Sequence, residues 1–393
     1  MFKLDYEWEW LVLATLVFLT ALLIVLGLRE FLQLSRSVAK IPIRIHVNGS
    51  RGKSSVTRLI SAGLRAGGLK VLAKTTGTAP RVIGFDGIDR SVHRLRSASI
   101  SEQIKVLDSF SKQKPDAVVL ECMAVQPEYQ WICEQQMVRA TLGVITNVRS
   151  DHLSEMGPSL KNVAMSLSNT IPQNGQMVIG EDHFSAEFEK VAAKRNTKLD
   201  VVMADAVSSE EIAAFQETVH ADNVAVALRT CELTGIDRTV ALEGMVTAAP
   251  DPGAAAFMEL RSNEKENTFF NALAANDPES TGVLWSLAFE KTTRSKVAVF
   301  LNSREDRRQR THQLLGLLGD QMHTDLLVIR GDHISPVLHH DGMEIKTFPA
   351  SVQPDEVAEY FMNLDDHLIF AMGNIVGWGH EFVDYLRENY TNG

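Results

Sequence analysis

The chain of 393 residues has few cysteines and an excess of acidic over basic residues. Its three cysteines, Cys122, Cys133 and Cys231, are too few and too scattered for a disulfide framework or a zinc site, and they are typical of reduced thiols facing the cytosol. Because 39 Lys and Arg oppose 49 Asp and Glu, the formal net charge is −10. Such a chain lacks the basic face of a general nucleic-acid binder, so we expect no nucleic-acid partner.

Charge is also missing from one long stretch, Leu11–Leu28, which would span about 27 Å as a helix. Trp8 and Trp10 stand just before it, where aromatic rings favour the membrane interface. Acidic residues precede the stretch and basic residues follow it, which predicts an outer N-terminus and a cytoplasmic remainder. The segment lacks the features of a cleavable signal peptide, and a buried core helix is the weaker alternative.

We therefore predict a single-pass anchor in the plasma membrane within residues 1–40, with its span at about 11–28. A helix over residues 29–40 would add about 18 Å beyond the membrane. The rest of the chain would then stand close to the bilayer.

A strand, a glycine-rich loop and a helix follow the anchor. Apolar residues alternate along Ile41–Val47, and helical spacing begins at Val56. The loop between them reads Gly-x-x-Gly-Lys-Ser, a variant of the phosphate loop in which Val47 replaces the usual first glycine. Backbone amides would hold phosphates, Lys53 would reach the outer phosphates, and Ser54 would help to hold Mg²⁺. The predicted nucleotide-binding residues are Gly49, Ser50, Arg51, Gly52, Lys53, Ser54 and Ser55.

Two further strands end in polar residues. Asp116–Glu121 reads as a buried strand that ends in a carboxylate, and Leu142–Asn147 is followed shortly by His152. Ligands bind at the carboxyl ends of parallel strands, where a carboxylate beside phosphates could hold Mg²⁺. By themselves, an exposed strand-end glutamate and a surface or core histidine explain the two residues as well.

In their order along the chain, these features resemble those of the ATP-dependent Mur ligase and folylpolyglutamate synthase superfamily. The resemblance is closer still to the ligase subunits of capsular poly-γ-glutamate synthases, and it covers most of residues 41–380. The segments that carry it are VNGSRGKSSVTRLI (47–60), AKTTGTAPR (73–81), ECMAVQPEYQ (121–130), TNVRSDHLSEMGP (146–158), APDPGA (249–254), AANDPEST (274–281) and AMGNIVGWG (371–379), together with Ala221-Asp222-Asn223.

The resemblance implies an ATP- and Mg²⁺-dependent amide ligase that polymerises glutamate through γ-linkages by way of an acyl phosphate. It implies Lys53, Glu121 and His152 as catalytic residues, and Ser54, Glu121 and His152 as the metal site. Asn223 would contact the nucleotide. The implied partners are glutamate, the growing polymer and small membrane subunits of a capsule synthase or export complex.

Two segments are candidates for the substrate side. The first follows the second strand and offers hydroxyls and cations for a carboxylate, although a solvated turn is the alternative; its residues are Lys74, Thr76, Thr78 and Arg81. The second ends a strand at 296–302 and holds Arg304 and Arg307, whose forked guanidinium groups suit the carboxylates of a polyglutamate. A charged helix start explains the second segment nearly as well.

Three features depart from the resembled families. No UDP-sugar-binding domain precedes the phosphate loop, which argues against a peptidoglycan precursor as substrate. Many relatives have Asp-Tyr-Ala-His-Asn-Pro where this chain reads Leu273-Ala-Ala-Asn276-Asp277-Pro278, so Asn276 and Asp277 are carried over to the nucleotide site only weakly. The carbamylated lysine of some relatives has no clear counterpart, and Lys161 is the candidate position.

The alternation of strands and helices predicts an α/β protein. Strands near 42–47, 70–74, 117–120, 142–147 and 177–179 imply a mostly parallel sheet in a Mur-ligase-like ATP-binding domain over 41–250. A linker near 248–253 leads to a smaller, Rossmann-like domain over 251–393, with strands near 296–302, 324–330 and 367–372. The alternative functions are a membrane-anchored kinase that regulates capsule export, a non-catalytic ATP-binding scaffold, and a γ-glutamyl ligase acting on another acceptor.

Overall fold

The structure, a computed structural model, describes most of the chain. The described residues are 3–76, 80–92, 99–215, 219–248, 255–262, 265–275, 278–305, 308–318, 322–331 and 343–391. They form two compact units, of which unit 1 holds nearly everything up to Ala249 and unit 2 holds nearly everything from Pro250 onward. Most of the predicted linker near 248–253 lies outside the described residues.

Unit 1 is built on an eight-stranded sheet with the order β4-β3-β2-β5-β1-β6-β7-β8. The strands are parallel except for β3, which runs antiparallel to both β2 and β4. The strands are β1 (Ile43–Asn48), β2 (Val71–Thr75), β3 (Arg81–Ile83), β4 (Asp89–Ser91), β5 (Ala117–Glu121), β6 (Leu142–Ile145), β7 (Gln176–Ile179) and β8 (Lys198–Val201). This arrangement confirms a mostly parallel sheet, and it adds the β3–β4 hairpin and edge strand β8, which the sequence did not reveal.

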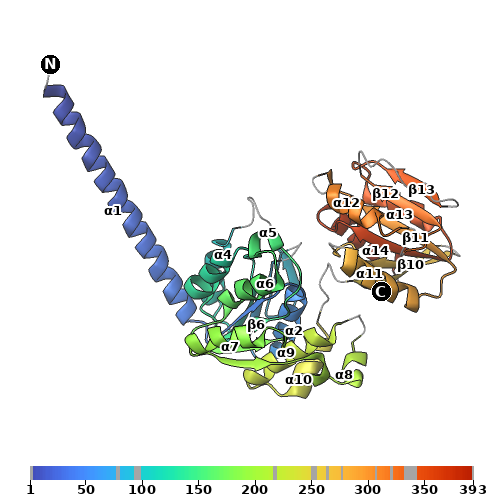
Figure 1. The fold of residues 1–393 in the computed structure, drawn as a ribbon, viewed down its shortest axis with the longest axis horizontal. Helices are drawn as coiled ribbons and strands as arrows, with labels where there is room; N and C mark the ends of the chain where they lie inside the picture. The colour runs from blue at the N-terminus through green and yellow to red at the C-terminus, as the bar shows by residue number, and fades with distance from the viewer. Residues whose placement is uncertain are drawn as a thin grey trace. The chain divides into compact units, whose positions relative to one another are not determined.

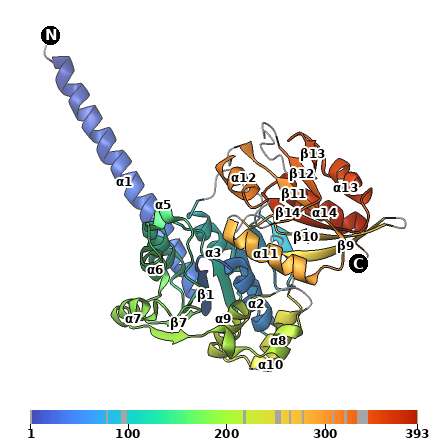
Figure 2. The ribbon, with the colours of Figure 1, turned by 45° about the vertical axis from the view of Figure 1, so that its right-hand side comes forward.

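The helices of unit 1 pack on this sheet and on one another (Figure 2). The strand residues Val118 and Leu120 share an apolar cluster with the helices α1 and α3, which cover that face. The helices are α1 (Lys3–Ala39), α2 (Lys53–Ala66), α3 (Glu102–Lys112), α4 (Pro127–Trp131), α5 (Leu153–Met156), α6 (Leu160–Leu167), α7 (Ser185–Lys194), α8 (Ser209–Ala213), α9 (Ala221–Leu233) and α10 (Arg238–Val246), with a π-helix, η1, over Ile132–Val138 and 3-10 turns at Ser168–Thr170 (η2) and Ala204–Ala206 (η3).

Helix α1 is one uninterrupted helix that runs away from the body of unit 1 (Figure 1). Its segment Trp8–Ala39 is long and apolar enough to cross a membrane, and the most apolar part of that segment is fully exposed. Its last turns are different, because Leu34 and Val38 are about 5% exposed and belong to the apolar cluster with α3 and β5.

The helix expected over residues 29–40 is present as the end of α1, and its base is part of unit 1. Gln33 Nε2 and Ser37 Oγ both donate hydrogen bonds to Asp108 of α3, at 3.1 and 3.2 Å. Arg139 donates to Ser35 Oγ at 3.3 Å and lies over the ring of Phe31. Residues 31–38 thus fasten α1 to the rest of unit 1.

Unit 2 contains a six-stranded sheet with the order β13-β12-β11-β14-β10-β9, parallel except for the β9–β10 hairpin. The elements are β9 (Ala256–Ser262), β10 (Lys265–Asn271), β11 (Lys296–Asn302), β12 (Leu326–Arg330), β13 (Glu344–Phe348), β14 (His367–Gly373), α11 (Pro278–Lys291), α12 (Arg308–Leu315), α13 (Pro354–Met362) and α14 (Trp378–Tyr390). Alternate strand residues face two separate cores: Phe269 and Phe300 pack in the core with α13 and α14, and Phe270 and Val299 pack in the other. Strands β9, β10 and β13 were not predicted.

The buried base of α1 predicts a stability effect that the exposed part of the helix does not share. Replacing Leu34 by Ala should lower the free energy of unfolding by about 2–5 kcal/mol, because it leaves a cavity in the core beneath α3. Leu32→Ala, two residues earlier and 43% exposed, is the matched control and should change stability little. Denaturant unfolding of the full chain in detergent, followed by circular dichroism, measures both. Equal effects of the two variants would contradict a docked base.

Candidate active site

The glycine-rich loop leaves the carboxyl end of β1 and enters α2 through two residues with left-handed backbone conformations. Gly49 has φ of 134° and Gly52 has φ of 79°, values that side chains rarely tolerate. A Cβ atom at Gly49 would lie 2.0 Å from Thr146 Oγ1, and one at Gly52 would lie 2.5 Å from Asn223 Oδ1. The two glycines are thus required both by backbone conformation and by the close approach of neighbouring side chains.

The segment after β6 holds this loop in place. Asn147 Oδ1 accepts a hydrogen bond from the Arg51 amide and Asn147 Nδ2 donates to the Arg51 carbonyl, each at 3.1 Å. Thr146 Oγ1 donates to the same carbonyl. Ser50 Oγ donates to the carbonyl of Arg149 and accepts from its amide, at 3.1 and 2.9 Å. The backbone of one loop residue, Arg51, is therefore held on both its amide and its carbonyl side, which fixes the direction of the amides that follow it.

Lys53 is the first residue of α2, and its side chain curls back over the loop. Its Nζ donates to the carbonyl oxygens of Gly49 at 2.7 Å and Ser50 at 3.1 Å. A helix N-terminus that presents free amides, together with a lysine at the same point, forms a site for an anion. This arrangement suits the phosphates of a nucleotide.

Glu121 and Ser54 meet beside the loop, as predicted from the sequence. Strand β5 lies next to β1, so its last residue, Glu121, reaches the beginning of α2. The Glu121 side chain is 2% exposed, and its Oε2 accepts hydrogen bonds from Ser54 Oγ at 2.8 Å and from the Thr76 amide at 2.7 Å. A carboxylate and a hydroxyl so placed are hard oxygen ligands of the kind that Mg²⁺ prefers, and the donor set fits that ion.

His152 lies on the neighbouring segment. It adopts a left-handed conformation with φ of 50° directly before α5, and its side chain is about half exposed. Its ring nitrogens lie 3.9 Å from carboxylate oxygens of Asp151 and Glu155. Asp151 also approaches Arg51 of the loop, at 3.6 Å. The structure thus joins Ser54 to Glu121, whereas His152 contacts residues of its own segment. Among the described residues, no group of three or more His, Cys, Asp or Glu side chains forms a ready metal cluster.

The remaining predicted residues divide into described and undescribed ones. Lys74 is fully buried and its Nζ lies 2.8 Å from Glu102 Oε1, so its charge is matched by a carboxylate inside the protein. Arg81 begins β3, Arg304 follows β11, and Lys161 is exposed and lies 3.6 Å from Glu187. Thr78, Asn276, Asp277 and Arg307 lie outside the described residues. The roles of all these residues stay predictions.

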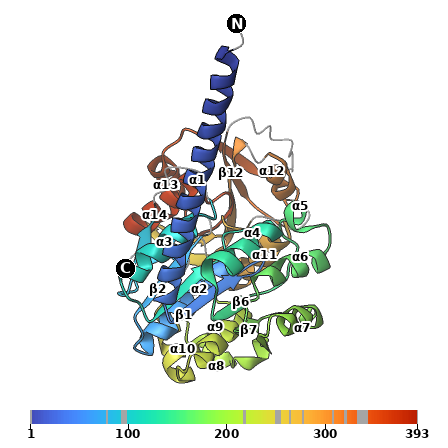
Figure 3. The same ribbon diagram turned by 90° about the vertical axis from the view of Figure 1, so that its left-hand side faces the viewer.

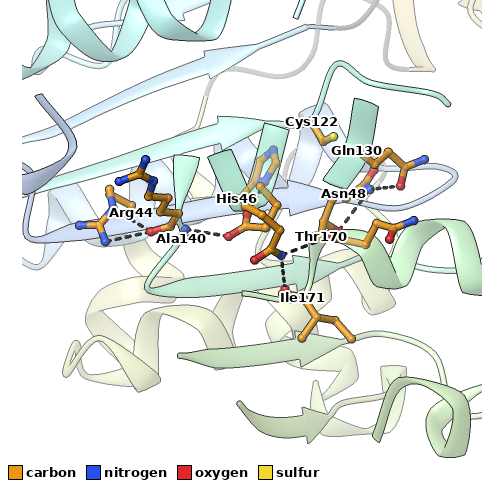
Figure 4. Close-up of polar contacts among 12 residues, drawn as sticks. Arg44, His46, Asn48, Cys122, Gln130, Ala140, Thr170 and Ile171 are labelled. Atoms are coloured by element: carbon orange, nitrogen blue, oxygen red, sulfur yellow. Dashed lines mark hydrogen bonds and ion pairs between the residues drawn. The ribbon is translucent and has the colours of Figure 1, made fainter. Parts of the chain in front are cut away.

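The sequence did not reveal a buried polar layer beneath the loop (Figure 4). His46 Nδ1 lies 2.7 Å from Glu134 Oε2, and both side chains are almost fully buried. Asn48 Nδ2 donates to Gln130 Oε1 at 3.0 Å, and Gln130 comes from the segment that follows β5. Residues 44, 46 and 48 alternate with apolar ones along β1, a pattern that usually indicates a solvated face. Here β5 and β6 flank the strand. Polar side chains such as Glu134 and Gln130, and not solvent, contact the polar residues of β1.

The pKa of His46 is raised to about 10. Burial alone would lower the pKa of His46, but interactions with the Cys122 sulfur and the Glu134 carboxylate more than offset it. With its pKa raised in this way, His46 is protonated near neutral pH, and its Nδ1 lies beside the Glu134 carboxyl group. The pair joins η1 to the strand that carries the phosphate loop.

The fold and the site together define a ligase of the Mur type. Residues 47–248 match the Mur ligase middle domain. The structure is also similar to the bifunctional folylpolyglutamate synthase/dihydrofolate synthase of Yersinia pestis complexed with AMPPNP and Mn, with a TM-score of 0.63 at 15% identity, over 92% of each chain. At that identity the likeness shows the fold.

Sequence comparison places the chain within one family of this class. Residues 257–389 match the poly-gamma-glutamate synthase CapB C-terminal domain. The chain is 32% identical to PGA synthase CapB of Bacillus subtilis (strain 168) over 384 residues, which are 95% of this chain and 97% of that protein. It is 33% identical to the capsule biosynthesis protein CapB of Bacillus anthracis over 382 residues, 94% and 82% of the two chains. The chain belongs to the CapB family of poly-γ-glutamate synthases.

The contact between Gly52 and Asn223 predicts a specific loss of nucleotide binding. Gly52→Ala would force a methyl group against the Asn223 amide in a left-handed conformation, and we expect the Kd for ATP to rise at least about tenfold. Gly68→Ala is the control, since Gly68 has a similar φ of 87° and no atom within 4 Å of the added Cβ. It should carry the conformational cost without the loss of affinity. Calorimetric titration with a non-hydrolysable ATP analogue distinguishes them, and equal losses would contradict the proposed contact.

The His46–Glu134 pair predicts a stability that depends on pH. Because the pKa of His46 in the folded state lies above the ordinary value of 6.5, its stabilising effect is complete below about pH 6.5 and is lost as the pH rises through about 10. Glu134→Gln should cost about 3–5 kcal/mol near neutral pH. It should also make the fall in Tm between pH 7 and 10.5 less steep, because only the interaction of His46 with Cys122 remains to raise the pKa. Glu128→Gln, an exposed change on α4, is the control. A steep fall that persists in Glu134→Gln would contradict this assignment.

Proposed function

We propose that this chain is an ATP-dependent γ-glutamyl ligase that makes poly-γ-glutamate. The observation that carries the proposal is the pairing of Ser54 with Glu121 beside a lysine-bearing phosphate loop, in a chain that matches CapB proteins over nearly its whole length. The Mur-ligase-type fold supports ATP-driven amide formation as the reaction class.

The reaction couples two transfers. The γ-carboxylate of glutamate, or of the end of the growing chain, attacks the γ-phosphorus of ATP, which forms an acyl phosphate and releases ADP. The amine of the next glutamate then attacks the acyl carbon, gives up a proton and expels inorganic phosphate. The net products are one amide bond, ADP and phosphate.

The residues of the loop would act on the phosphates. Lys53 would leave its two carbonyl partners and contact the outer phosphates, where its charge would offset the charge that develops on the transferring group. Ser54 and Glu121 would hold Mg²⁺, which supplies further neutralisation of phosphate charge when it is bound. His152 would position this ion, and Asn223, already against Gly52, would contact the nucleotide.

Carboxylate recognition is assigned to the predicted substrate residues. Arg304, at the carboxyl end of β11, is the best placed of the described ones, because ligands of parallel sheets bind at such strand ends. Arg307 follows in the same segment. Thr76, Thr78 and Arg81 stay separate candidates for carboxylate binding. Lys74 fits direct binding less well than the others, since its charge is already matched by Glu102.

The setting of the enzyme is proposed from α1. Its exposed apolar run supports a single span in the plasma membrane, with both units in the cytoplasm. A ligase held there would be placed to pass polymer to small membrane subunits of a capsule synthase or export complex.

The decisive experiment measures phosphate release from ATP and Mg²⁺ by the full chain in lipid, with each amino acid offered singly. We expect turnover only with glutamate, and γ-linked product by mass spectrometry. Lys53→Ala should lower kcat by about 10²–10³-fold, because it removes stabilisation of the transition state. Lys70→Ala, at a lysine that precedes β2, is the control and should retain turnover.

Turnover that ignores glutamate would contradict the ligase. If phosphate label then appeared on Tyr385 or Tyr390, the chain would be a kinase. The structure speaks against that alternative, because both tyrosines are partly buried on α14 and pack on one core of unit 2 instead of extending from a free tail.

A further inference from the structure

The base of α1 fixes the orientation of unit 1 relative to the anchor. The helix is continuous from Lys3 to Ala39, so no flexible linker separates its exposed apolar run from its docked end. Hydrogen bonds to Asp108 and from Arg139 fix that end. Leu34 and Val38 of the same end pack in an apolar cluster of unit 1. Because helix and unit form one body, whatever surrounds the apolar run also determines which face of unit 1 lies nearest to it.

Exposed apolar side chains gather on three consecutive short helices of unit 1. After α1, the described residues of unit 1 carry eight exposed large apolar side chains, of which five lie on α4, α5 and α6. Helix α6 contacts both α4 and α5, so the three helices pack side by side. We call their outer side the α4–α6 face. The exposed apolar residues of the three helices are Tyr129, Trp131, Leu153, Leu160 and Met165.

The α4–α6 face lies at the end of unit 1 from which α1 projects. Figures 1 and 3 both show α4 and α5 toward the projecting part of α1, with α8 and α10 at the opposite end. Topology gives the same direction. Helix α4 follows the carboxyl end of β5, and α5 follows that of β6. Helix α3 runs back from the same end, where Gln103 near its N-terminus donates to the Glu121 carbonyl at 3.2 Å.

We propose that the α4–α6 face rests on the surface of the bilayer that α1 spans, with Trp131 in the headgroup region. The inference rests on the proposed membrane anchoring and adds a second, peripheral contact. The bilayer is the surface that contacts this face because the apolar run of α1 and the α4–α6 face belong to the same unit and lie at the same end of it. Tyr and Trp are the side chains that favour the interface, with an apolar ring and a polar edge.

Charge does not drive this contact. The acidic residues Glu128 and Glu155 and the basic residues Arg149 and Lys161 stand on or beside the α4–α6 face, so it carries both signs. The attraction is therefore apolar, and it should not need anionic lipid.

The phosphate loop leaves the carboxyl end of β1. In this orientation the loop lies at the membrane-facing end of the sheet.

The test uses quenching of tryptophan emission in the full chain in phosphatidylcholine nanodiscs. Half of the preparations contain lipid brominated near the headgroup end of its acyl chains. Trp8→Phe and Trp10→Phe remove the aromatic residues of the anchor, and the emission lost on further Trp131→Phe substitution reports Trp131 alone. We expect brominated lipid to remove most of that emission, because interfacial side chains lie within about 5–10 Å of the headgroup boundary.

The controls distinguish this inference from the anchoring on which it rests. Thr239→Trp, an exposed position on α10 at the opposite end, is placed in a chain without Trp8, Trp10 and Trp131, and its emission should be unaffected by bromine. The unaltered chain should show quenching of Trp8 and Trp10. If that quenching occurs and Trp131 is not quenched, the α4–α6 face is covered by something other than lipid and the inference is wrong. If Trp8 and Trp10 are not quenched, both the anchoring and the inference fail.

Discussion

The site depends on how closely the glycine-rich loop approaches the two segments beside it. Thr146 lies where a Cβ of Gly49 would be, and the Asn223 amide lies where a Cβ of Gly52 would be. This close approach lets the Asn147 side chain accept a hydrogen bond from the Arg51 amide and donate one to the Arg51 carbonyl. A loop so held keeps its amides and Lys53 in one orientation, which makes it a preorganised anion site instead of a flexible turn.

The order of the central strands supplies the other groups. Strand β1 lies between β5 and β6, so the loop receives Glu121 from one neighbour and Asn147 from the other. Beneath it, the His46–Glu134 pair and the Asn48–Gln130 bond connect β1 to the segment after β5. Polar groups in the centre of a sheet are costly unless they are paired. The bonds of His46 Nδ1 and Asn48 Nδ2 offset part of this cost and tie β1 to the segment after β5.

The sequence predicted the elements whose signal is local. The apolar strands at 43–48, 117–121 and 296–302 and the loop before α2 could be identified from composition and spacing. Hairpin β3–β4, with two strands of three residues, is too short for a periodic signal. The role of His46 depends on Glu134, 88 residues away, and such a partner leaves no local trace. The packing of Leu34 and Val38 against unit 1 could not be predicted either, because both residues continue an apolar helix without any change of pattern.

The docked base of α1 limits the rotation of unit 1 relative to this helix. A membrane helix joined by a flexible linker holds a domain near the bilayer but leaves it free to rotate. Here Phe31 and Ser35 contact Arg139, whose carbonyl accepts two bonds from Arg44 at the start of β1. Arg139 therefore connects the base of α1 to β1, the strand from which the phosphate loop departs. If α1 spans a membrane as proposed, this packing keeps the phosphate loop in one orientation relative to the bilayer.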